Sequence, residues 1–397
     1  MTTRTVPQHP DERAAELAAT RQLKMAESFH RYVRGSTLQF YEWLDSLPVS
    51  HLPDGPPIWI CGDCHIGNLG PVPDRKGKID IHIRDFDQTT ISNPVYDLLR
   101  LALSLAAAAV SADLPGATTP LMLEAMMEGY EQAFAADFDE DSDLIMPQSV
   151  QQARRQSVAA AWQSLSDKHQ GSRRLATPGS KKFWPLSPEE TQAIEGLLHS
   201  GALPPLIARL KGGDAPENTR LLDAAYWQKG CSSLGLLRYA ALLQTGKKDY
   251  LMLDFKEAAA SLAPTADAAE FPDNPAERIV TGTRRLTPYL GKRMQAVNLN
   301  GHAVYVRELL PEDLKLDIRL LTQAEAIRAA AYLSAVVGKA HSRQMDEHTR
   351  RHWLAELARN RTRQLDAPTW LWNAVCQLLP VHLEAYLLHC RRYALSA

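Results

Sequence analysis

Five polar residues between positions 63 and 87 have the types and the spacing that metal-assisted chemistry needs. They are Asp63, His65, Asn68, Asp85 and Asp87. The first three belong to the segment GDCHIGN, and the last two belong to the segment RDFD that follows it. Carboxylates that lie close together repel each other and are costly to bury, and a bound metal ion offsets that cost. Oxygen ligands of this kind suit magnesium, so the pattern predicts a magnesium site.

The separation of these residues is typical of a kinase-type phosphotransferase. Such enzymes need a catalytic aspartate, a magnesium-binding asparagine five residues later, and a second metal-binding aspartate after the next short hairpin. Asp63 and Asn68 have that separation, and Asp85 follows the next expected strand. In this interpretation Asp63 orients and deprotonates a hydroxyl group, while Asn68 and Asp85 hold magnesium on a triphosphate. His65 polarises or braces the loop, and Asp87 binds a second magnesium ion or braces the same loop.

Three segments in this region resemble the motifs of aminoglycoside and choline phosphotransferases, which belong to the protein-kinase-like superfamily. The segments are GDCHIGN, IRDFDQ and NPVYDLLRLALSL. A closer resemblance is to a bacterial family known as a domain of unknown function, and it is carried by YVRG, GDCHIGNLG, RDFDQ, LDFKEA, YVREL and KAHSRQ. The resemblance implies that Asp63 is the catalytic base, that Asn68 and Asp85 are metal ligands, and that Asp97 braces the catalytic loop. Cys61 departs from the usual pattern, which has a histidine before the glycine and aspartate.

A glycine-containing turn and a strand lysine further along the chain predict where a nucleotide binds. In the segment KGCSSLGLLRYAALL, Gly230 and Gly235 flank Ser232 and Ser233 between two expected strands. Backbone N–H groups of such a turn can approach phosphates. Lys256, in LMLDFKEA, stands where kinases have the lysine that contacts the α- and β-phosphates. The alternative for this lysine is an exposed charge on an edge strand.

Glu277 is the candidate partner of that lysine, because it lies early in the next expected helix. The alternative is a carboxylate that the helix dipole favours near the N-terminus. In ordinary kinases the nucleotide-binding strands precede the catalytic loop, whereas here they follow it. The order predicts a circularly permuted kinase-like fold, in which Lys256 and Asp85 face one cleft.

The hydrophobic pattern predicts an α+β protein with a small β-sheet nucleotide lobe and a larger helical lobe. We expect strands at 58–61, 78–87 and 302–309, and three more between 226 and 263. The expected division is residues 1–217 for the first helices and the catalytic loop, 218–310 for the β-rich lobe, and 311–397 for helices that complete the helical lobe.

Composition narrows the function classes. The 397 residues carry a formal net charge of -2, so no basic excess favours nucleic acid or a membrane surface as a partner. The N-terminal segment lacks the apolar core of a signal peptide, and no apolar run is long enough to span a bilayer. We therefore expect a cytoplasmic protein. From the motifs, we expect its partners to be ATP, Mg²⁺ and a hydroxyl-bearing acceptor. Five dispersed cysteines do not form a disulfide framework, and Cys61 and Cys64 are expected to be small half-buried residues that flank a polar motif.

Other functions remain open on the sequence. A kinase-like fold can also transfer AMP from ATP, or it can sense a nucleotide without catalysis. A metallophosphoesterase shares the GDxH start, but it needs later GDxxDRG and GNH motifs that the chain lacks. A solvated loop whose carboxylates cap helices and turns is the alternative to a metal site.

Overall fold

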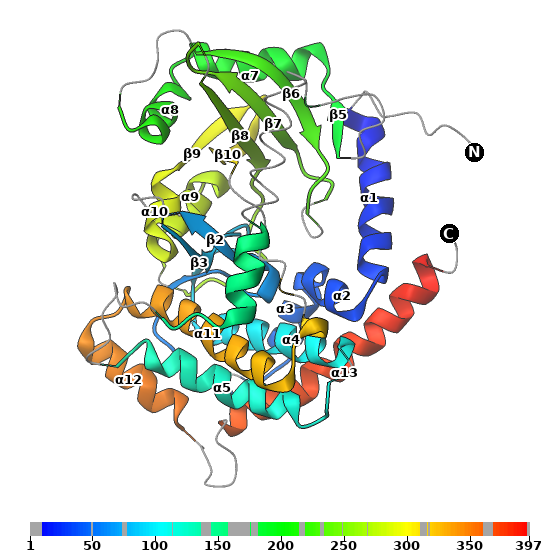
Figure 1. Cartoon of the computed structure of the whole chain (residues 1–397), viewed down its shortest axis with the longest axis vertical. Helices are drawn as coiled ribbons and strands as arrows, with labels where there is room; N and C mark the ends of the chain where they lie inside the picture. The colour runs from blue at the N-terminus through cyan, green and yellow to red at the C-terminus, as the bar shows by residue number, and fades with distance from the viewer. Residues whose placement is uncertain are drawn as a thin grey trace.

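A six-stranded sheet and a set of helices occupy opposite ends of the computed structural model (Figure 1). Two further sheets of two strands each lie between them. All neighbouring strands among the described residues run antiparallel. The structure describes residues 10–48, 51–73, 78–112, 114–135, 144–157, 175, 182–213, 219–230, 234–247, 249–267, 269–309, 316, 318–359 and 368–394. The expected mixture of helices with a small sheet is confirmed.

The large sheet has the strand order β5-β6-β7-β8-β10-β9. Its strands are β5 (Phe183–Pro185), β6 (Arg220–Trp227), β7 (Arg238–Gln244), β8 (Tyr250–Glu257), β9 (Met294–Leu299) and β10 (His302–Glu308). Six consecutive residues are buried in each of the central strands β7 and β8, because both faces of the sheet are covered. The first of the three strands expected between 226 and 263 lies earlier, as β6. Its register shifts between Leu221 and Asp223, which weakens the alternation that marks a strand.

Helices α7 (Pro188–His199) and α8 (Pro204–Lys211) cover one face of this sheet (Figure 1). Glu190 completes a capping box at the start of α7 and also accepts a hydrogen bond of 2.7 Å from Arg13. The sheet-bearing part therefore begins at β5, before the boundary expected near residue 218. The pattern of β5 is only three residues long, too short to predict a strand.

The helical part is built around α4 (Val95–Ser111), in which 14 of 17 side chains are buried. The helices around it are α1 (Pro10–Ala26), α2 (Phe29–Gly35), α3 (Thr37–Asp45), α5 (Thr118–Gln132), α11 (Gln323–Ser342), α12 (Glu347–Leu357) and α13 (Thr369–Tyr393). α5 and α11 pack tightly because a Cβ on Gly129 would lie 2.1 Å from the Ala331 carbonyl oxygen. None of the helices in the described ranges combines the length and apolar character of a membrane span.

The first and last helices lie side by side. α1 runs along one side of the molecule from the sheet to the helical part, where it meets the end of α13 (Figure 1). There His389 Nε2 lies 2.9 Å from the Gln22 carbonyl oxygen, and the Tyr386 hydroxyl donates to the Ala26 carbonyl at 3.3 Å. Segments from the two ends of the chain therefore complete one helical part.

Short elements make up the rest of the fold, and those that Figure 1 labels lie between the large sheet and the helices. They are β1 (Ile58–Ile60) paired with β4 (Thr90–Ser92), β2 (Leu69–Pro73) paired with β3 (Ile79–Ile83), the 3-10 helices η2 (Ile66–Asn68) and η3 (Ile318–Leu320), and the helices α9 (Pro275–Leu286) and α10 (Pro288–Lys292). The strands expected at 58–61 and 78–87 are confirmed as the shorter β1 and β3. β10 confirms the strand expected at 302–309, whereas β9 has no counterpart among the expected strands.

Candidate active site

The GDCHIGN loop joins β1 to β2 and depends on a glycine at its start. Gly62 has a φ of +76°, which side chains rarely adopt, and a Cβ there would lie 2.1 Å from the Gln88 carbonyl oxygen. The loop therefore packs directly against the segment that follows β3, which carries Asp85 and Asp87. The Tyr41 hydroxyl also donates a hydrogen bond to the Gly62 carbonyl oxygen.

Asp97, in the first turn of α4, holds the start of this loop. Its carboxylate accepts hydrogen bonds from the backbone N–H groups of Cys61, at 2.8 Å, and Gly62, at 2.9 Å. His341 Nε2 lies 3.1 Å from the same carboxylate, and its Nδ1 lies 2.9 Å from the Tyr130 hydroxyl. The bracing role expected for Asp97 is confirmed. His341, on α11, is fully buried, and it contacts the loop only through Asp97 among the described residues.

Asp63 is buried and hydrogen bonded on both carboxylate oxygens. Arg100 Nε donates to Oδ1 at 2.7 Å, and the Thr37 hydroxyl donates to Oδ2 at 3.1 Å. Burial raises the pKa of Asp63, and the negative charge of Asp85 adds to the rise, against the opposing effect of Arg100. Arg100 and Thr37 were not expected as site residues. The signal for Arg100 is its position three residues after Asp97, which puts both side chains on the same face of α4.

Asn68 and His65 lie on either side of a short 3-10 turn in the loop. Asn68 Nδ2 donates a hydrogen bond of 2.8 Å to the Asp63 carbonyl oxygen, which fixes the orientation of the amide. Its Oδ1 accepts no hydrogen bond from the described residues and is left for another ligand. His65 Nε2 lies 3.8 Å from Asp63 Oδ2, and its buried Nδ1 has no hydrogen-bond partner in the described part of the chain. Burial, and then the charge of Arg34, hold the pKa of His65 well below its usual value, so the ring is neutral at pH 7.

Lys256, on β8, meets two aspartates from the segment after β3. Its Nζ lies 3.3 Å from Asp85 Oδ1 and 2.5 Å from Asp87 Oδ2. The Tyr305 hydroxyl, on β10, donates a hydrogen bond of 3.0 Å to Asp87 Oδ1. The lysine side chain is 2% exposed, so it is not the solvated edge charge of the alternative reading. The predicted proximity of Lys256 and Asp85 is confirmed, across 171 positions of the chain.

The surroundings of Asp85 and Asp87 shift the pKa values of the two carboxyl groups in opposite directions. Burial alone would raise the pKa of Asp85, but the positive charges of Lys256, Arg307 and Arg238 outweigh it and hold the pKa below the usual range. Burial, and then the charge of Asp85, raise the pKa of Asp87. Asp85 is therefore the firmly ionised member of the pair. Its side chain is also 37% exposed, so solvent reaches it.

The predicted pair of Lys256 and Glu277 is wrong. Glu277 is exposed in the first turn of α9, where the N-cap residue Asn274 accepts a hydrogen bond from its backbone N–H at 3.3 Å. An acidic side chain there is favoured by the helix dipole, which was the alternative reading. The next residue, Arg278, points inward instead. It donates hydrogen bonds to the carbonyl oxygens of Asp87, at 2.9 Å, and Thr89.

The predicted glycine turn is described only at its ends. Gly230 and Gly235 have φ values of +103° and +112°, so both positions favour glycine, as a phosphate-approaching turn requires. The carbonyl oxygen of Gly230 accepts a hydrogen bond of 3.3 Å from Lys24. Ser232 and Ser233 lie outside the described residues. Their role, and that of the turn, stay predictions.

The oxygen atoms around Asp85 fit a magnesium ion better than the cysteines fit a metal. Asp85 offers an ionised and accessible carboxylate, and Asn68 offers an amide oxygen that is free of hydrogen bonds from the described residues. Cys61, Cys64 and Asp97 also have ligand atoms within 4.8 Å of one another. However, both carboxylate oxygens of Asp97 already accept hydrogen bonds.

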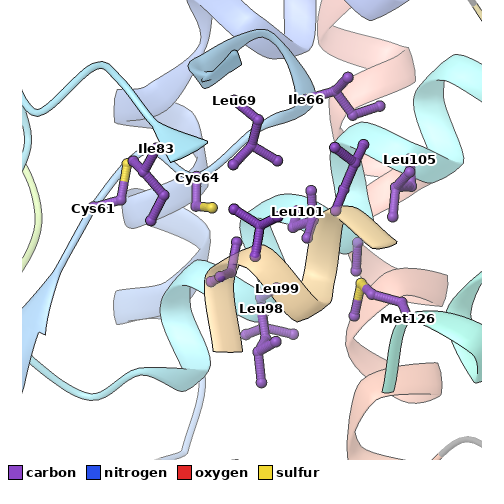
Figure 2. Close-up of a cluster of buried hydrophobic side chains, with 14 of the residues drawn as sticks. Cys61, Cys64, Ile66, Leu69, Ile83, Leu98, Leu99, Leu101, Leu105 and Met126 are labelled. Atoms are coloured by element: carbon purple, nitrogen blue, oxygen red, sulfur yellow. The ribbon is translucent and has the colours of Figure 1, made fainter. Parts of the chain in front are cut away.

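Both thiols lie in the apolar core. Figure 2 shows Cys61 and Cys64 in a buried cluster with leucines of α4. A hydrogen bond with Cys64, and then burial, raise the pKa of Cys61 well above its usual value, which keeps it a thiol. The cysteines lie beside the loop as expected, but they are fully buried rather than half-buried.

Comparison with known proteins identifies the family of the chain but not an activity. No curated protein matches the sequence, and no solved structure matches it either. The model of one family matches residues 13–392, a range that includes the loop, both aspartates and Lys256. The chain therefore belongs to the bacterial family described as "Uncharacterized protein conserved in bacteria (DUF2252)".

Proposed function

We propose that this protein is an ATP- and magnesium-dependent phosphotransferase that acts on a hydroxyl-bearing acceptor, either a small molecule or a protein. The observation that carries the proposal is the contact of Lys256 with Asp85 and Asp87. A buried lysine from one part of the fold and two aspartates from another meet in one place. That pairing of a strand lysine with metal-binding aspartates is what a triphosphate with its magnesium ion requires.

Each side chain takes a role that its contacts suit. Lys256 would contact the phosphates, and Asp85, Asn68 Oδ1 and Asp87 would hold magnesium. When bound, the metal neutralises charge on the triphosphate, and the protein has to supply little beyond positioning and electrostatic stabilisation. The hydrogen bond from Asn68 Nδ2 to the Asp63 carbonyl supports the role of Asn68, because it turns Oδ1 away from the backbone.

Asp63 would orient the acceptor hydroxyl and take its proton. Burial raises its pKa, and a raised pKa makes a carboxylate a better general base. The proton would move to the carboxylate as the acceptor oxygen forms its bond to the γ-phosphorus and the bond from that phosphorus to the bridging oxygen breaks, with ADP as the leaving group. Arg100 and Thr37 hold the carboxylate in place for that step.

The proposal includes a circularly permuted kinase-like arrangement with two lobes. The sheet with Lys256 would be the nucleotide lobe, and the helices with the GDCHIGN loop would be the catalytic lobe. Two observations support this. The strands that carry Lys256 and Tyr305 follow the catalytic loop in the chain, and helices from both chain ends pack together in the helical part. Permutation is tolerated where chain ends lie close together.

The hydrogen bonds that Asp63 already accepts favour a second candidate function. This is a nucleotide-sensing module without catalysis. An aspartate whose two oxygens both accept hydrogen bonds, one from an arginine, is a weaker acceptor for a substrate proton. In that case Mg-ATP would bind and no phosphoryl group would leave it.

Chromatography of the nucleotides after incubation with Mg-ATP separates these functions. A phosphotransferase produces ADP, faster when a suitable acceptor is present. A nucleotidyl transferase with the same fold produces pyrophosphate and attached AMP. Bound but unchanged ATP supports the sensing module. ATP that neither binds nor reacts at millimolar concentration overturns the proposal.

A further inference from the structure

The face of the sheet that carries Lys256 also carries a row of ionic side chains. Side chains alternate along a strand, so Asp254 lies on the same face as Lys256, two residues before it. Arg238 on β7 is the register partner of Lys256, and Arg307 on β10 is the register partner of Asp254. The opposite face carries Tyr239, Leu253 and Phe255, which pack under α7 and α8. The ionic row therefore faces the helical part of the protein.

The row contains two arginines that share one buried carboxylate. Arg238 donates to both oxygens of Asp254, at 3.0 and 2.8 Å, and Arg307 Nε donates to one of them at 3.2 Å. Arg307 Nη1 also donates to the Arg84 carbonyl at 3.0 Å. Arg238 Nη1 and Arg307 Nη2 make no hydrogen bond with the described residues. Arg238, Arg307 and Asp254 together carry one net positive charge. The two Nη groups remain as donors for a further acceptor.

These arginines line a pocket between the sheet and the residues near β2 and β3. The pocket is narrow, with a cavity volume of ≈ 10 Å³, which is room for about one water-sized group. Arg84, Lys229, Arg238 and Arg307 line it together with Trp227 and Val72. Asp254 and Glu308 are the acidic residues of the lining, and Glu308 is paired with Arg293. The pocket thus has four cationic side chains and two carboxylates, both of which already have arginine partners.

The chemistry of this pocket does not match a purine ring. A base needs an apolar slot against the sheet, and here that surface holds a buried carboxylate between two guanidinium groups. The remaining Nη donors of Arg238 and Arg307 instead suit the oxygens of a phosphate, through charge-assisted hydrogen bonds. The pocket also lies beside the triphosphate site proposed above, because the charges of Arg307 and Arg238 both act on Asp85.

We propose that Arg84, Lys229, Arg238 and Arg307 form a phosphate-binding subsite next to the Lys256–Asp85 pair. The presence of an anion site follows from these contacts, and its place in a reaction rests on the proposed function. Two sources could supply the phosphate. The nucleotide could lie with its phosphates along the ionic row and its base outside the pocket, or a phosphorylated acceptor could bind there.

Calorimetric titration with tripolyphosphate in EDTA tests the subsite without a base and without a metal. The parent protein should bind tripolyphosphate, with weaker binding at higher salt. Arg307→Lys and Lys229→Gln should each weaken binding about tenfold or more, because each removes a charge-assisted contact. Arg220→Gln is the matched control. It removes an arginine at the far end of β6, where Arg220 contacts Gln244, and it should bind like the parent.

The outcomes are distinguishable. Equal tripolyphosphate binding by the parent and both variants, or no binding by the parent, overturns the subsite. Binding of adenosine that is lost in the variants also overturns it, because the pocket would then hold a base. If Arg307→Lys fails to fold, Lys229→Gln still decides, since Lys229 is only half-buried.

A tripolyphosphate titration repeated in saturating Mg-ATP distinguishes the two sources of phosphate. Loss of tripolyphosphate binding assigns the subsite to the nucleotide, and retained binding assigns it to a phosphorylated acceptor. Should the parent bind tripolyphosphate but not Mg-ATP, the proposed function fails and the subsite stands.

Discussion

Arg100 and Asp63 form a buried ion pair in which Nε and Oδ1 are 2.7 Å apart. Arg100 is fully buried, and its second contact is a 2.7 Å hydrogen bond from Nη2 to the Val33 carbonyl at the end of α2. One guanidinium group therefore connects α2 and α4 to the proposed catalytic aspartate. The position of Asp63 depends on the packing of two helices, and its chemistry can be separated from that packing by substitution.

Asp63→Asn should reduce turnover while Mg-ATP binding stays nearly unchanged. The amide keeps the shape, its oxygen can still accept the hydrogen bond from Arg100, and its NH2 group can donate to the Thr37 hydroxyl instead, but it cannot take a proton. Loss of a general base costs on the order of 100- to 10,000-fold in rate. Steady-state kinetics and calorimetry with Mg-ATP measure the two effects. Equal losses of rate and of binding would assign Asp63 a structural role.

Lys256→Met should weaken Mg-ATP binding at least about tenfold. The substitution removes the cation that faces the phosphates and leaves Asp85 and Asp87 facing each other without a counter-charge. Lys247→Met is the control, because Lys247 is exposed in the turn between β7 and β8. Titration calorimetry of both variants checks the expectation. Unaltered binding by Lys256→Met would remove the lysine from the nucleotide site.

Asp85→Asn should abolish the magnesium-dependent part of ATP stabilisation, and Asn68→Ala should weaken it. Each change removes an oxygen ligand or its charge from the expected metal site. In the parent, ligand at ~100 times its dissociation constant should add about 2.7 kcal/mol to the unfolding free energy. Thermal denaturation with ATP, with and without magnesium, measures the effect, and the exposed Asp267→Asn serves as control. If Asp85→Asn responds to magnesium like the parent, the metal assignment is wrong.

Asp97→Ala should lower the unfolding free energy by roughly 3 kcal/mol. The change leaves the backbone N–H groups of Cys61 and Gly62 buried without an acceptor and removes the partner of His341. Urea denaturation gives the value, and Asp267→Ala, an exposed aspartate, should cost about 0.5 kcal/mol or less. A small effect of Asp97→Ala would mean that the loop start does not depend on this carboxylate.

Stability should fall as the pH drops from 6.5 toward 4, and His382 should contribute to the fall. Burial, and then the charge of Arg100, lower the pKa of His382 from 6.5 to about 4. In that interval the unfolded chain binds a proton that the folded protein does not, so acid favours unfolding by about 1.4 kcal/mol per pH unit. Above pH 6.5 this group has no effect. Urea denaturation at several pH values should give a shallower slope for His382→Gln, and equal slopes would contradict the expectation.

Sequence reasoning found the parts of the site that are local in the chain. The GDCHIGN loop, the two aspartates after β3 and the bracing aspartate of α4 all lie within 36 residues, where spacing carries information. The lysine strand was found because a glycine turn and a strand pattern mark it. The strand β6 was placed too late, since its register shift breaks the alternation.

The sequence pattern could not predict contacts between residues that are far apart in the chain. Thr37 and Tyr305 became visible only when folding brought them to Asp63 and Asp87. Glu277 was a wrong choice because helical position alone does not say which way a side chain points, and the inward-facing residue there is Arg278. The ionic row on the sheet was not predicted either. Arg238 and Arg307 meet Asp254 only in the assembled sheet.

The 171-residue separation of Asp85 from Lys256 has a consequence for synthesis on the ribosome. At roughly 5 to 20 residues per second, the aspartates emerge on the order of 10 to 30 seconds before their lysine. During that interval the nascent chain holds Asp85 and Asp87 without the cation that will lie between them. Because burial without a counter-charge is costly, the two carboxylates are expected to stay hydrated until the sheet has been made. The site is thus expected to form late, after β8 and the helices that follow the sheet in the chain have been made.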